Sequence, residues 1–370
     1  MNYIKSVSDI GVKIVGYTDY PTLSRMLKTK SLRLIALMLF PKTLYIRIGV
    51  GNYDGVVVLH EGFDSIYTGY FLGEYFKIPR IALLQLPPFY SSKKRLYNIL
   101  KDWVLWRTLV ADNLWVKIML KSEAIVEFNV FHKLSFTRMN RLLRNYTTLI
   151  AVSKAIPYEM GGEWLDKIVS LDPGVSLDEN DLSIINAVRS RVREKRNYIV
   201  FGGRPISGKG LVEALISFSL ISKHYKDLKL VITGRIRNPF LHGLRRFCKR
   251  LGIEDKVIFT GFVPREKRFE IVARARLMLY PSHVDAFPYA VLESLHLGTP
   301  VVGYRIPALE IYYSRQPGVK LVEEGDLEAL TIEAMNVLEK GVEAVEPPKI
   351  KSWREIMADE VAIIRKALRM

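Results

Sequence analysis

Short apolar runs alternate with amphipathic stretches from residue 197 onward. The apolar runs are rich in β-branched residues and predict strands at residues 198–201, 228–233, 256–260, 277–280 and 300–303. Between them, helical periodicity predicts helices at residues 209–223, 239–251, 265–273 and 289–297. Strands that alternate with helices are typical of a parallel, doubly wound sheet.

The first half of the chain shows the same alternation less clearly. Its pattern predicts strands at residues 12–17, 55–59, 80–84, 148–152 and 168–171. A helix expected at residues 3–10 runs straight into the strand at 12–17, so we expect an N-terminal domain without its first strand. The two halves together predict an α/β fold of two Rossmann-like domains that face each other across a cleft, where the ligand should bind.

Turn signals and changes of composition divide the chain. We expect an N-terminal domain at residues 1–175, because a turn at Asp172-Pro173-Gly174 precedes a polar, charged stretch at 176–196 that reads as a linker. A second Rossmann-like domain should occupy residues 197–350. After Pro347-Pro348, helical periodicity predicts a final helix within residues 351–370, which could cap either domain.

Charge and cysteine usage narrow the partners and the compartment. The net charge is +17, and residues 20–154 hold 20 Lys and Arg against 8 Asp and Glu, or 20 − 8 = +12 of it. Such a surface could attract nucleic acid, anionic lipid or phosphorylated substrates, but no nucleic-acid-binding motif is present. Cys248 is the single cysteine, and no run reads as a signal peptide or a bilayer span, so a cytoplasmic protein is expected.

A glycine-rich cluster at residues 201–210 joins a predicted strand to a predicted helix. Glycines such as Gly203 permit close backbone approach, while Arg204 and Lys209 could sit over an anion at the helix N-terminus. A surface turn with two solvated cations explains the cluster equally well. Gly234 and Gly261 end two further strands and would meet the same rim of the sheet.

Residues 280–302 contain two carboxylates, one after a predicted strand and one within a predicted helix. A strand leads to Asp285, a helix begins near Pro288, and Glu293 lies within that helix. Free amides at the first turn could bind a phosphate or a sugar hydroxyl, and both carboxylates could accept hydrogen bonds from a polyol. The structural alternative makes Asp285 a helix cap and Glu293 a solvated side chain.

With these residues the chain resembles the retaining glycosyltransferases of the GT-B fold known as glycosyl transferases group 1, or family 4. Asp285, seven residues and Glu293, followed by Gly298-Thr299-Pro300-Val301-Val302, match that family's pattern, and the resemblance covers residues 145–370 well. It implies that Arg204 and Lys209 bind the donor diphosphate, Glu293 the ribose and Asp285 the transferred sugar. The remaining donor contacts that it implies are Gly203, Gly234, Phe262, Val263, Phe287, Pro288, Tyr289, Ala290 and Val291. It also implies a UDP-sugar or GDP-sugar donor, no metal and no other cofactor. In the same way it implies an acceptor-binding domain at residues 1–175, a nucleotide-sugar-binding domain at residues 197–350 and a C-terminal helix at 351–370 that crosses back to the first domain.

Some positions depart from the family pattern. Asp285 stands where glutamate is commoner, and Gln85 stands where many members have a histidine, so His60, one strand earlier, is a second candidate on the acceptor side. The resemblance implies a hexosyltransferase that retains configuration. The alternatives are a catalytically silent glycosyltransferase-like subunit, and an epimerase or hydrolase of sugar nucleotides with the same fold.

The basic N-terminal half of the chain should indicate the class of acceptor. Between residues 91 and 120, one helical stripe contains Leu96, Ile99, Trp103, Trp106 and Val110, and the cations beside it are Lys93, Lys94, Arg95, Lys101 and Arg107. This pattern predicts either an interfacial helix or a helix that packs inward under a basic surface. The first case favours a lipid-linked acceptor and peripheral contact with the inner face of a membrane. A soluble glycan remains the other candidate acceptor.

Overall fold

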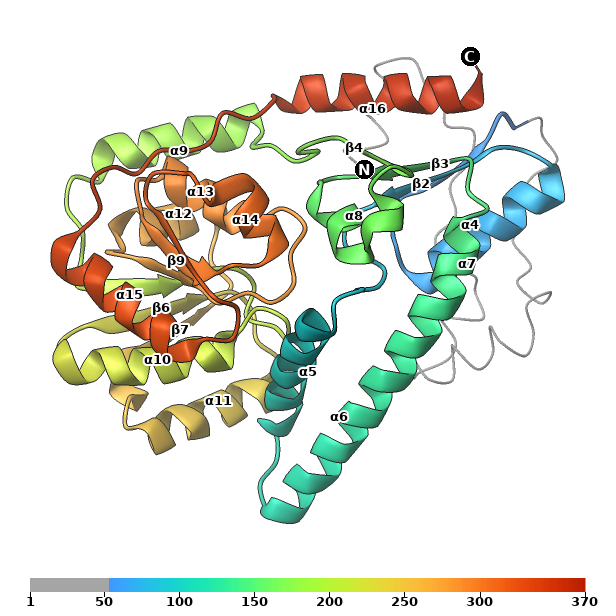
Figure 1. The fold of residues 1–370 in the computed structure, drawn as a ribbon. Helices are drawn as coiled ribbons and strands as arrows, with labels where there is room; N and C mark the ends of the chain where they lie inside the picture. The colour runs from blue at the N-terminus through green and yellow to red at the C-terminus, as the bar shows by residue number, and fades with distance from the viewer. Residues whose placement is uncertain (1–52, 370) are drawn as a thin grey trace.

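Two α/β lobes make up the computed structural model, which describes residues 53–369 (Figure 1). The N-terminal lobe has a four-stranded sheet and the C-terminal lobe a six-stranded sheet, and every pairing within them is parallel. This confirms the expected α/β class with two Rossmann-like domains. The helix and strand predicted at residues 3–10 and 12–17 lie outside the described residues.

The N-terminal sheet has the order β1-β2-β3-β4. Its elements are β1 (Val56–Val58), α4 (Phe63–Phe76), β2 (Arg80–Leu84), α5 (Lys93–Thr108), α6 (Leu114–Leu134), a π-helical turn (Ser135–Met139), α7 (Asn140–Leu143), β3 (Thr148–Ala151), α8 (Ala155–Met160), a 3₁₀ turn (Gly162–Trp164) and β4 (Ile168–Ser170). All four strands fall at or within one residue of the ranges that the apolar runs predict.

The C-terminal sheet has the order β10-β9-β8-β5-β6-β7. Its elements are β5 (Tyr198–Phe201), α10 (Leu211–His224), β6 (Lys229–Thr233), α11 (Asn238–Leu251), a 3₁₀ turn (Glu254–Lys256), β7 (Val257–Gly261), α12 (Arg265–Arg274), β8 (Met278–Tyr280), α13 (Tyr289–His296), β9 (Val301–Tyr304), α14 (Pro307–Tyr313), β10 (Val319–Val322) and α15 (Leu327–Lys340). From β5 the chain first builds one side of the sheet and then returns to β8 to build the other. The loops after β5 and β8 therefore meet at the switch point, where ligands of such sheets bind.

The expected linker at 176–196 contains a helix, α9 (Glu179–Arg191), which the sequence analysis missed. The side chain of Asp178 caps it by accepting the backbone N–H of Asp181 at 2.7 Å. Ile185 and Val188 are buried in the core of the C-terminal lobe. Their spacing is helical, but the surrounding polar residues hide it from a simple reading of composition.

The final helix, α16 (Trp353–Leu368), runs along the N-terminal lobe although it follows the C-terminal lobe in sequence (Figure 1). Ile356, Met357 and Ile364 pack in one buried cluster with Ile81 of β2 and Ile150 of β3. Ser352 and Glu355 form a capping box at its start. The helix therefore completes the hydrophobic core of the lobe that the chain left at β4.

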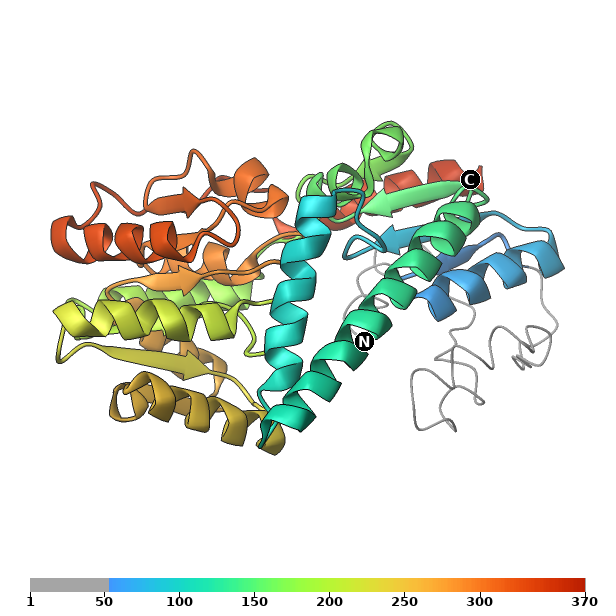
Figure 2. The ribbon, with the colours of Figure 1, turned by 60° about the horizontal axis from the view of Figure 1, so that its bottom comes forward.

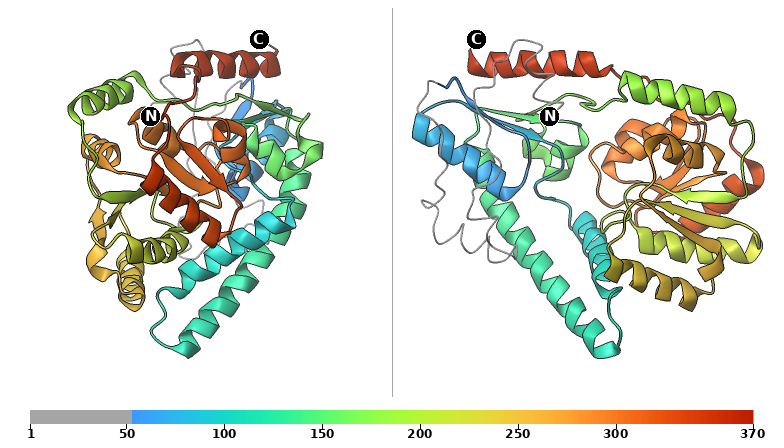
Figure 3. Two further views of the ribbon diagram at one scale, coloured as in Figure 1. Left: turned by 60° about the vertical axis from the view of Figure 1, so that its left-hand side comes forward. Right: turned by 180° about the vertical axis from the view of Figure 1, so that it is seen from behind.

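The stretch at residues 91–120 is not one helix. It forms α5 and the start of α6, which together make a hairpin that projects from between the lobes in all views (Figure 2; Figure 3). Trp106 of α5 stacks on Phe240 of α11, with ring centroids 4.9 Å apart and an interplanar angle of 17°. Trp106 and Leu109 belong to the core of the C-terminal lobe, so the α5 stripe packs inward and is not an interfacial helix.

Candidate functional site

The glycine-rich cluster forms the turn between β5 and the N-terminus of α10. Gly210 caps this helix with φ of 67°, and a Cβ atom there would lie 1.9 Å from the carbonyl oxygen of Pro281. Only glycine allows that backbone conformation and that approach. The loop after β5 is thus pressed against the loop after β8, as the strand order at the switch point requires.

Lys209 and Asp285 meet at this contact. The Nζ atom of Lys209 donates to Oδ2 of Asp285 at 2.6 Å and to the carbonyl oxygen of Val284 at 2.7 Å. The hydroxyl of Tyr280 donates to the same carboxylate oxygen. Burial and the charge of Asp285 raise the pKa of Tyr280 well above its usual value, so its hydroxyl stays protonated and keeps donating. The sequence placed Lys209 on a phosphate and Asp285 on a sugar, and the structure brings both side chains to one point.

Arg204 is exposed on the same loop, and no carboxylate among residues 53–369 pairs with its guanidinium. Gly203 lies beside the ring of Tyr280, and Gly234, at the end of β6, lies against Pro205. The backbone N–H of Gly234 donates to the carbonyl oxygen of Gly261 at 2.9 Å. The ends of β5, β6 and β7 therefore gather at one rim, with Arg204 open to solvent.

Phe262 and Val263 follow β7 on that rim. Phe262 is 81% exposed, which is uncommon for a side chain of its size, while Val263 is half-buried. The two residues lie beyond the bridge between Gly234 and Gly261. This position fits the donor contact that the resemblance implies for both residues, which stays a prediction.

Glu293 is not a solvated side chain. It is 3% exposed, and the guanidinium of Arg268 on α12 donates to both of its carboxylate oxygens, with an Nη2–Oε1 distance of 2.8 Å. Burial alone would lower the pKa of Arg268, but Glu293 raises it, so the guanidinium keeps its positive charge. A carboxylate offers about four lone-pair sites. The guanidinium occupies two of them, which leaves acceptor capacity for ribose hydroxyls.

The first turn of α13 presents backbone rather than side chains. Phe287 is buried against Tyr312 and Tyr313, and Val291 is buried in the core of the lobe. Pro288 stands at the N-cap position, and its carbonyl oxygen accepts the N–H of Val291 at 3.0 Å. The amides of Tyr289 and Ala290 come before this bond, at the open start of the helix, where they can bind hydroxyl or phosphate oxygens.

The two candidates on the acceptor side keep their hydrogen bonds within the N-terminal lobe. His60 is 61% exposed, and its Nδ1 atom accepts the N–H of Gly62 at 2.8 Å. The backbone N–H of Gln85 donates to the carboxylate of Glu61 at 3.1 Å. The side-chain amide of Gln85 donates to the carbonyl oxygen of Leu59 at 2.9 Å. Both side chains therefore hold the loops after β1 and β2 in place.

Tyr90, in the segment between β2 and α5, lies close to the donor loops. Burial is the main cause that raises its pKa, and the charges of Glu159, Asp285 and Glu61 raise it further. Tyr90 therefore lies near enough to Asp285 to feel its charge. The sequence analysis missed Tyr90, because a lone tyrosine after Pro-Pro-Phe matches no motif.

A buried chain of charges links the lobes next to this site. Arg95 of α5 donates to Glu159 of α8 at 2.7 Å, to Glu324 after β10, and to the carbonyl oxygen of His283 at 2.6 Å. His283 lies between Glu324 at 2.8 Å and Glu213 at 2.6 Å. The sequence analysis placed Arg95 among the surface cations beside the α5 stripe, and this was wrong, because the residue is only 7% exposed. The side chain is buried because it joins three segments that are distant in sequence.

Asp102 brings α5 onto the glycine-rich loop itself. Its carboxylate accepts the backbone N–H of Gly208 and, at 3.3 Å, the hydroxyl of Ser207. Burial raises the pKa of Asp102, while the bond from Gly208 opposes the rise. The contact fixes the loop between β5 and α10. A lone aspartate on an apolar stripe gave no signal of this role.

Comparison with known proteins decides the family. Residues 185–341 match the family model described as glycosyl transferases group 1, and this range contains Arg204, Lys209, Asp285 and Glu293. The C-terminal domain belongs to the glycosyl transferases group 1. An uncharacterized glycosyltransferase of Methanocaldococcus jannaschii is 30% identical to this chain over 165 residues, which are 42% of this chain and 41% of that protein.

A second relative of the group 1 domain is the alpha-monoglucosyldiacylglycerol synthase of Streptococcus pneumoniae. It is 30% identical over 128 residues, which are 34% of this chain and 29% of the relative. The matched part thus spans less than half the length of these curated relatives.

Solved structures share the arrangement of both lobes at low sequence identity. Sucrose-phosphate synthase from Thermosynechococcus elongatus has a TM-score of 0.56 at 14% identity, over 97% of this chain and 81% of that one. Anabaena HepE in complex with UDP and glucose has a TM-score of 0.53 at 15% identity, over 85% of this chain and 74% of that one. The two-lobed arrangement around the group 1 domain is therefore the GT-B fold.

No group of three or more His, Cys, Asp or Glu side chains within residues 53–369 is arranged to hold a metal ion. Within the same part of the chain, no helix combines the length and the apolar character needed to cross a bilayer.

Proposed function

We propose that the chain is a retaining glycosyltransferase that moves a hexose from a UDP-sugar or GDP-sugar to an acceptor hydroxyl. The observation that carries this proposal is the meeting of Lys209 and Asp285 at the switch point between β5 and β8, with Arg204 exposed on the same loop. A diphosphate is bound by cations and open amides, and a hexose by carboxylates that accept its hydroxyls. The site offers both kinds of group side by side.

In the proposed reaction, the bond between C1 of the sugar and the phosphate oxygen breaks, and its electron pair leaves with the nucleoside diphosphate. The acceptor oxygen bonds C1 on the face that the diphosphate leaves, and its proton passes to the departing phosphate. Arg204 and Lys209 neutralise the charge that grows on that phosphate. Asp285 and the amides of Tyr289 and Ala290 hold the sugar, while Glu293 holds the ribose.

The acceptor that we propose is lipid-linked and lies at the inner face of a membrane. The basic character of residues 20–154 favours an anionic surface next to the N-terminal lobe. The name of the pneumococcal relative describes a product built on diacylglycerol, which makes lipids the first acceptor class to test.

The decisive experiment incubates the full chain with UDP-, GDP- and ADP-sugars, with and without lipid extracts, and measures both nucleotide release and sugar incorporation. Release that depends on acceptor supports transfer, whereas release without incorporation indicates a hydrolase. Donor binding without turnover indicates a silent subunit, and a changed sugar indicates an epimerase. In an active preparation, Lys209→Ala and Glu293→Gln should each lower transfer by about 100-fold or more. Lys267→Ala, at an exposed ion pair, is the control and should leave it unchanged.

A further inference from the structure

The end of the α5–α6 hairpin carries a cluster of exposed apolar side chains, which we call the hairpin tip. It consists of Leu114, Trp115, Ile118 and Met119, which are 69%, 81%, 47% and 61% exposed. These residues form the first turns of α6 at the most projecting point of the hairpin (Figure 2). A contiguous exposed apolar surface of this kind marks a site of contact with another protein or with a membrane.

The exposed apolar side chains lie at helical spacing on α6, so their exposure does not come from a frayed helix end. Position 115 is followed at helical spacing by residues 118 and 119 on one face, and Val126 and Val130 continue that face with exposed side chains. Ala124, on the opposite face, is buried toward α5. Because α6 is apolar on two faces and packs through only one of them, the second face has no partner within the described part of the chain.

Cations surround the hairpin tip, and the nearby acids are paired. Lys117 and Lys121 are exposed between the apolar residues of α6. Asp112 pairs with Arg246 of α11, while Glu123 and Glu127 pair with Arg107 at 3.0 and 3.5 Å. The local surface is therefore apolar and positively charged, which is the combination that binds an interface with anionic headgroups.

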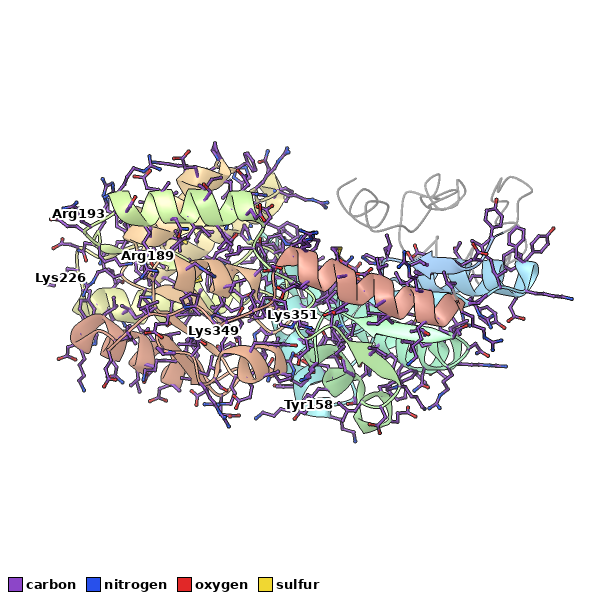
Figure 4. The ribbon with its side chains drawn as sticks, turned by 90° about the horizontal axis from the view of Figure 1, so that it is seen from above. Tyr158, Arg189, Arg193, Lys226, Lys349 and Lys351 are labelled. Atoms are coloured by element: carbon purple, nitrogen blue, oxygen red, sulfur yellow. The ribbon has the colours of Figure 1, made fainter. Side chains whose placement is uncertain are left out.

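The basic surface around α9 lacks the apolar part. Figure 4 looks onto the face opposite the hairpin tip and shows Arg189 and Arg193 near α9, with Lys349 and Lys351 before α16. α9 carries no large exposed apolar side chain. Positive charge alone does not show which of these faces would bind a membrane. Exposed apolar side chains together with positive charge favour the hairpin tip.

We propose that the hairpin tip inserts into the surface of a bilayer that contains anionic lipid. Leu114, Trp115, Ile118 and Met119 enter the boundary between headgroups and acyl chains, while Lys117 and Lys121 contact lipid phosphates. The proposal deepens the proposed function, because it gives a lipid-linked acceptor a defined approach. α5 extends less than two turns beyond Asp102, so the hairpin tip lies on the order of 10 to 20 Å from the glycine-rich loop.

The test is flotation of the full chain with vesicles of phosphatidylcholine alone and with 30 mol% phosphatidylglycerol, a composition of roughly one third anionic lipid chosen to exceed a minimal surface charge. We expect binding to the anionic vesicles, and Trp115→Gln/Met119→Gln should lower partitioning at least tenfold. Lys117→Gln/Lys121→Gln should remove most of the preference for phosphatidylglycerol. Tyr158→Gln/Leu165→Gln, at exposed apolar residues on another face of the N-terminal lobe, is the matched control and should bind like the wild type.

Unchanged partitioning of the Trp115/Met119 variant would overturn the proposal, and so would a wild-type chain that binds neither kind of vesicle. Self-association that is lost in the same variant would replace the membrane with a second copy of the chain. Binding of UDP- or GDP-sugar, measured on the same preparations, separates this result from the proposed function. A tip variant should bind donor normally, whereas failure of the proposed function would appear in every variant and in the wild type, as loss of donor binding or as donor binding without sugar transfer.

Discussion

Lys209 and Asp285, which lie on loops 76 residues apart in sequence, form a hydrogen-bonded ion pair of 2.6 Å at the switch point of the C-terminal sheet. The pair is mostly buried, and the hydroxyl of Tyr280 shares the Asp285 carboxylate. A cation that can bind a phosphate and a carboxylate that can bind a sugar thus hold each other in position. Each is fixed by the other before any ligand contact is considered.

The effects of removing each partner of this pair should therefore not be additive. Lys209→Met leaves a partly buried carboxylate with Tyr280 as its remaining side-chain donor, and should lower the free energy of unfolding by about 2 kcal/mol. Asp285→Asn should cost a similar amount. The double variant should be less destabilised than the sum of the two, by about 1 kcal/mol or more. Urea denaturation of the four proteins measures this coupling, and strict additivity would show that the contact contributes no stability.

The Arg268–Glu293 pair predicts a larger loss of stability. Arg268→Gln removes the guanidinium that binds both oxygens of a carboxylate that is 3% exposed, and should cost about 3 kcal/mol because the remaining charge is buried. The surface pair Arg191–Glu266 is the control, and Arg191→Gln should cost less than about 1 kcal/mol. Chemical denaturation of both variants compares them. Equal losses would mean that Glu293 is not held by Arg268 in solution.

His283 predicts a dependence of stability on pH. Burial alone would lower its pKa, but hydrogen bonds to Glu213 and Glu324 raise it to about 9, and Asp102 adds to the rise. Because this folded pKa exceeds the unfolded value of about 6.5, the contribution is fully present below pH 6.5 and is lost as pH rises through 9. The loss is on the order of 3 kcal/mol.

The measurement is the free energy of unfolding at pH 6 and at pH 9.5 for the wild type and His283→Gln. The wild type should lose stability between these values by a few kcal/mol more than the variant does. Other titrating groups cancel in the comparison of the two proteins. An identical pH dependence would contradict the charged state assigned to His283.

Asp102 should act as a positioning residue for the glycine-rich loop. Asp102→Ala removes the acceptor of the Gly208 N–H, so amide hydrogen exchange at residues 206–210 should become at least tenfold faster, and the KM for donor should rise more than kcat falls. Asp102→Asn keeps an oxygen acceptor and should restore most of the protection. Asp112→Ala, at an exposed carboxylate, is the control. Unchanged exchange in Asp102→Ala would leave the loop held by other contacts.

The sequence predicted what depends on local pattern. The strands at β2 and β5 and the helix α16 fall where periodicity places them, because apolar spacing reports directly on burial. β10 was missed, since Lys320 interrupts a short strand that is stable only beside β9. α9 was missed because its apolar residues are embedded in a polar stretch.

The donor loops were found in the sequence because a family spacing links Asp285 to Glu293. Their partners were not, since Arg268, Asp102 and Tyr90 belong to helices and loops that tertiary packing alone brings there. The stripe of α5 was read correctly as apolar, but its periodicity could not tell a lipid surface from the C-terminal lobe. In the sequence, the exposed apolar residues of α6 cannot be told from core residues. Only the exposed fraction of each side chain in the structure separates the two.

The position of α16 constrains the order in which this molecule can be built during synthesis. The core of the N-terminal lobe contains Ile356, Met357 and Ile364, so that lobe stays incomplete until α16 has left the ribosome. The C-terminal lobe needs only residues that precede this helix, together with α5, to close its own core. The C-terminal lobe is synthesised second but can therefore reach its native packing first. The N-terminal lobe, which is synthesised first, remains exposed to chaperones and proteases in the meantime.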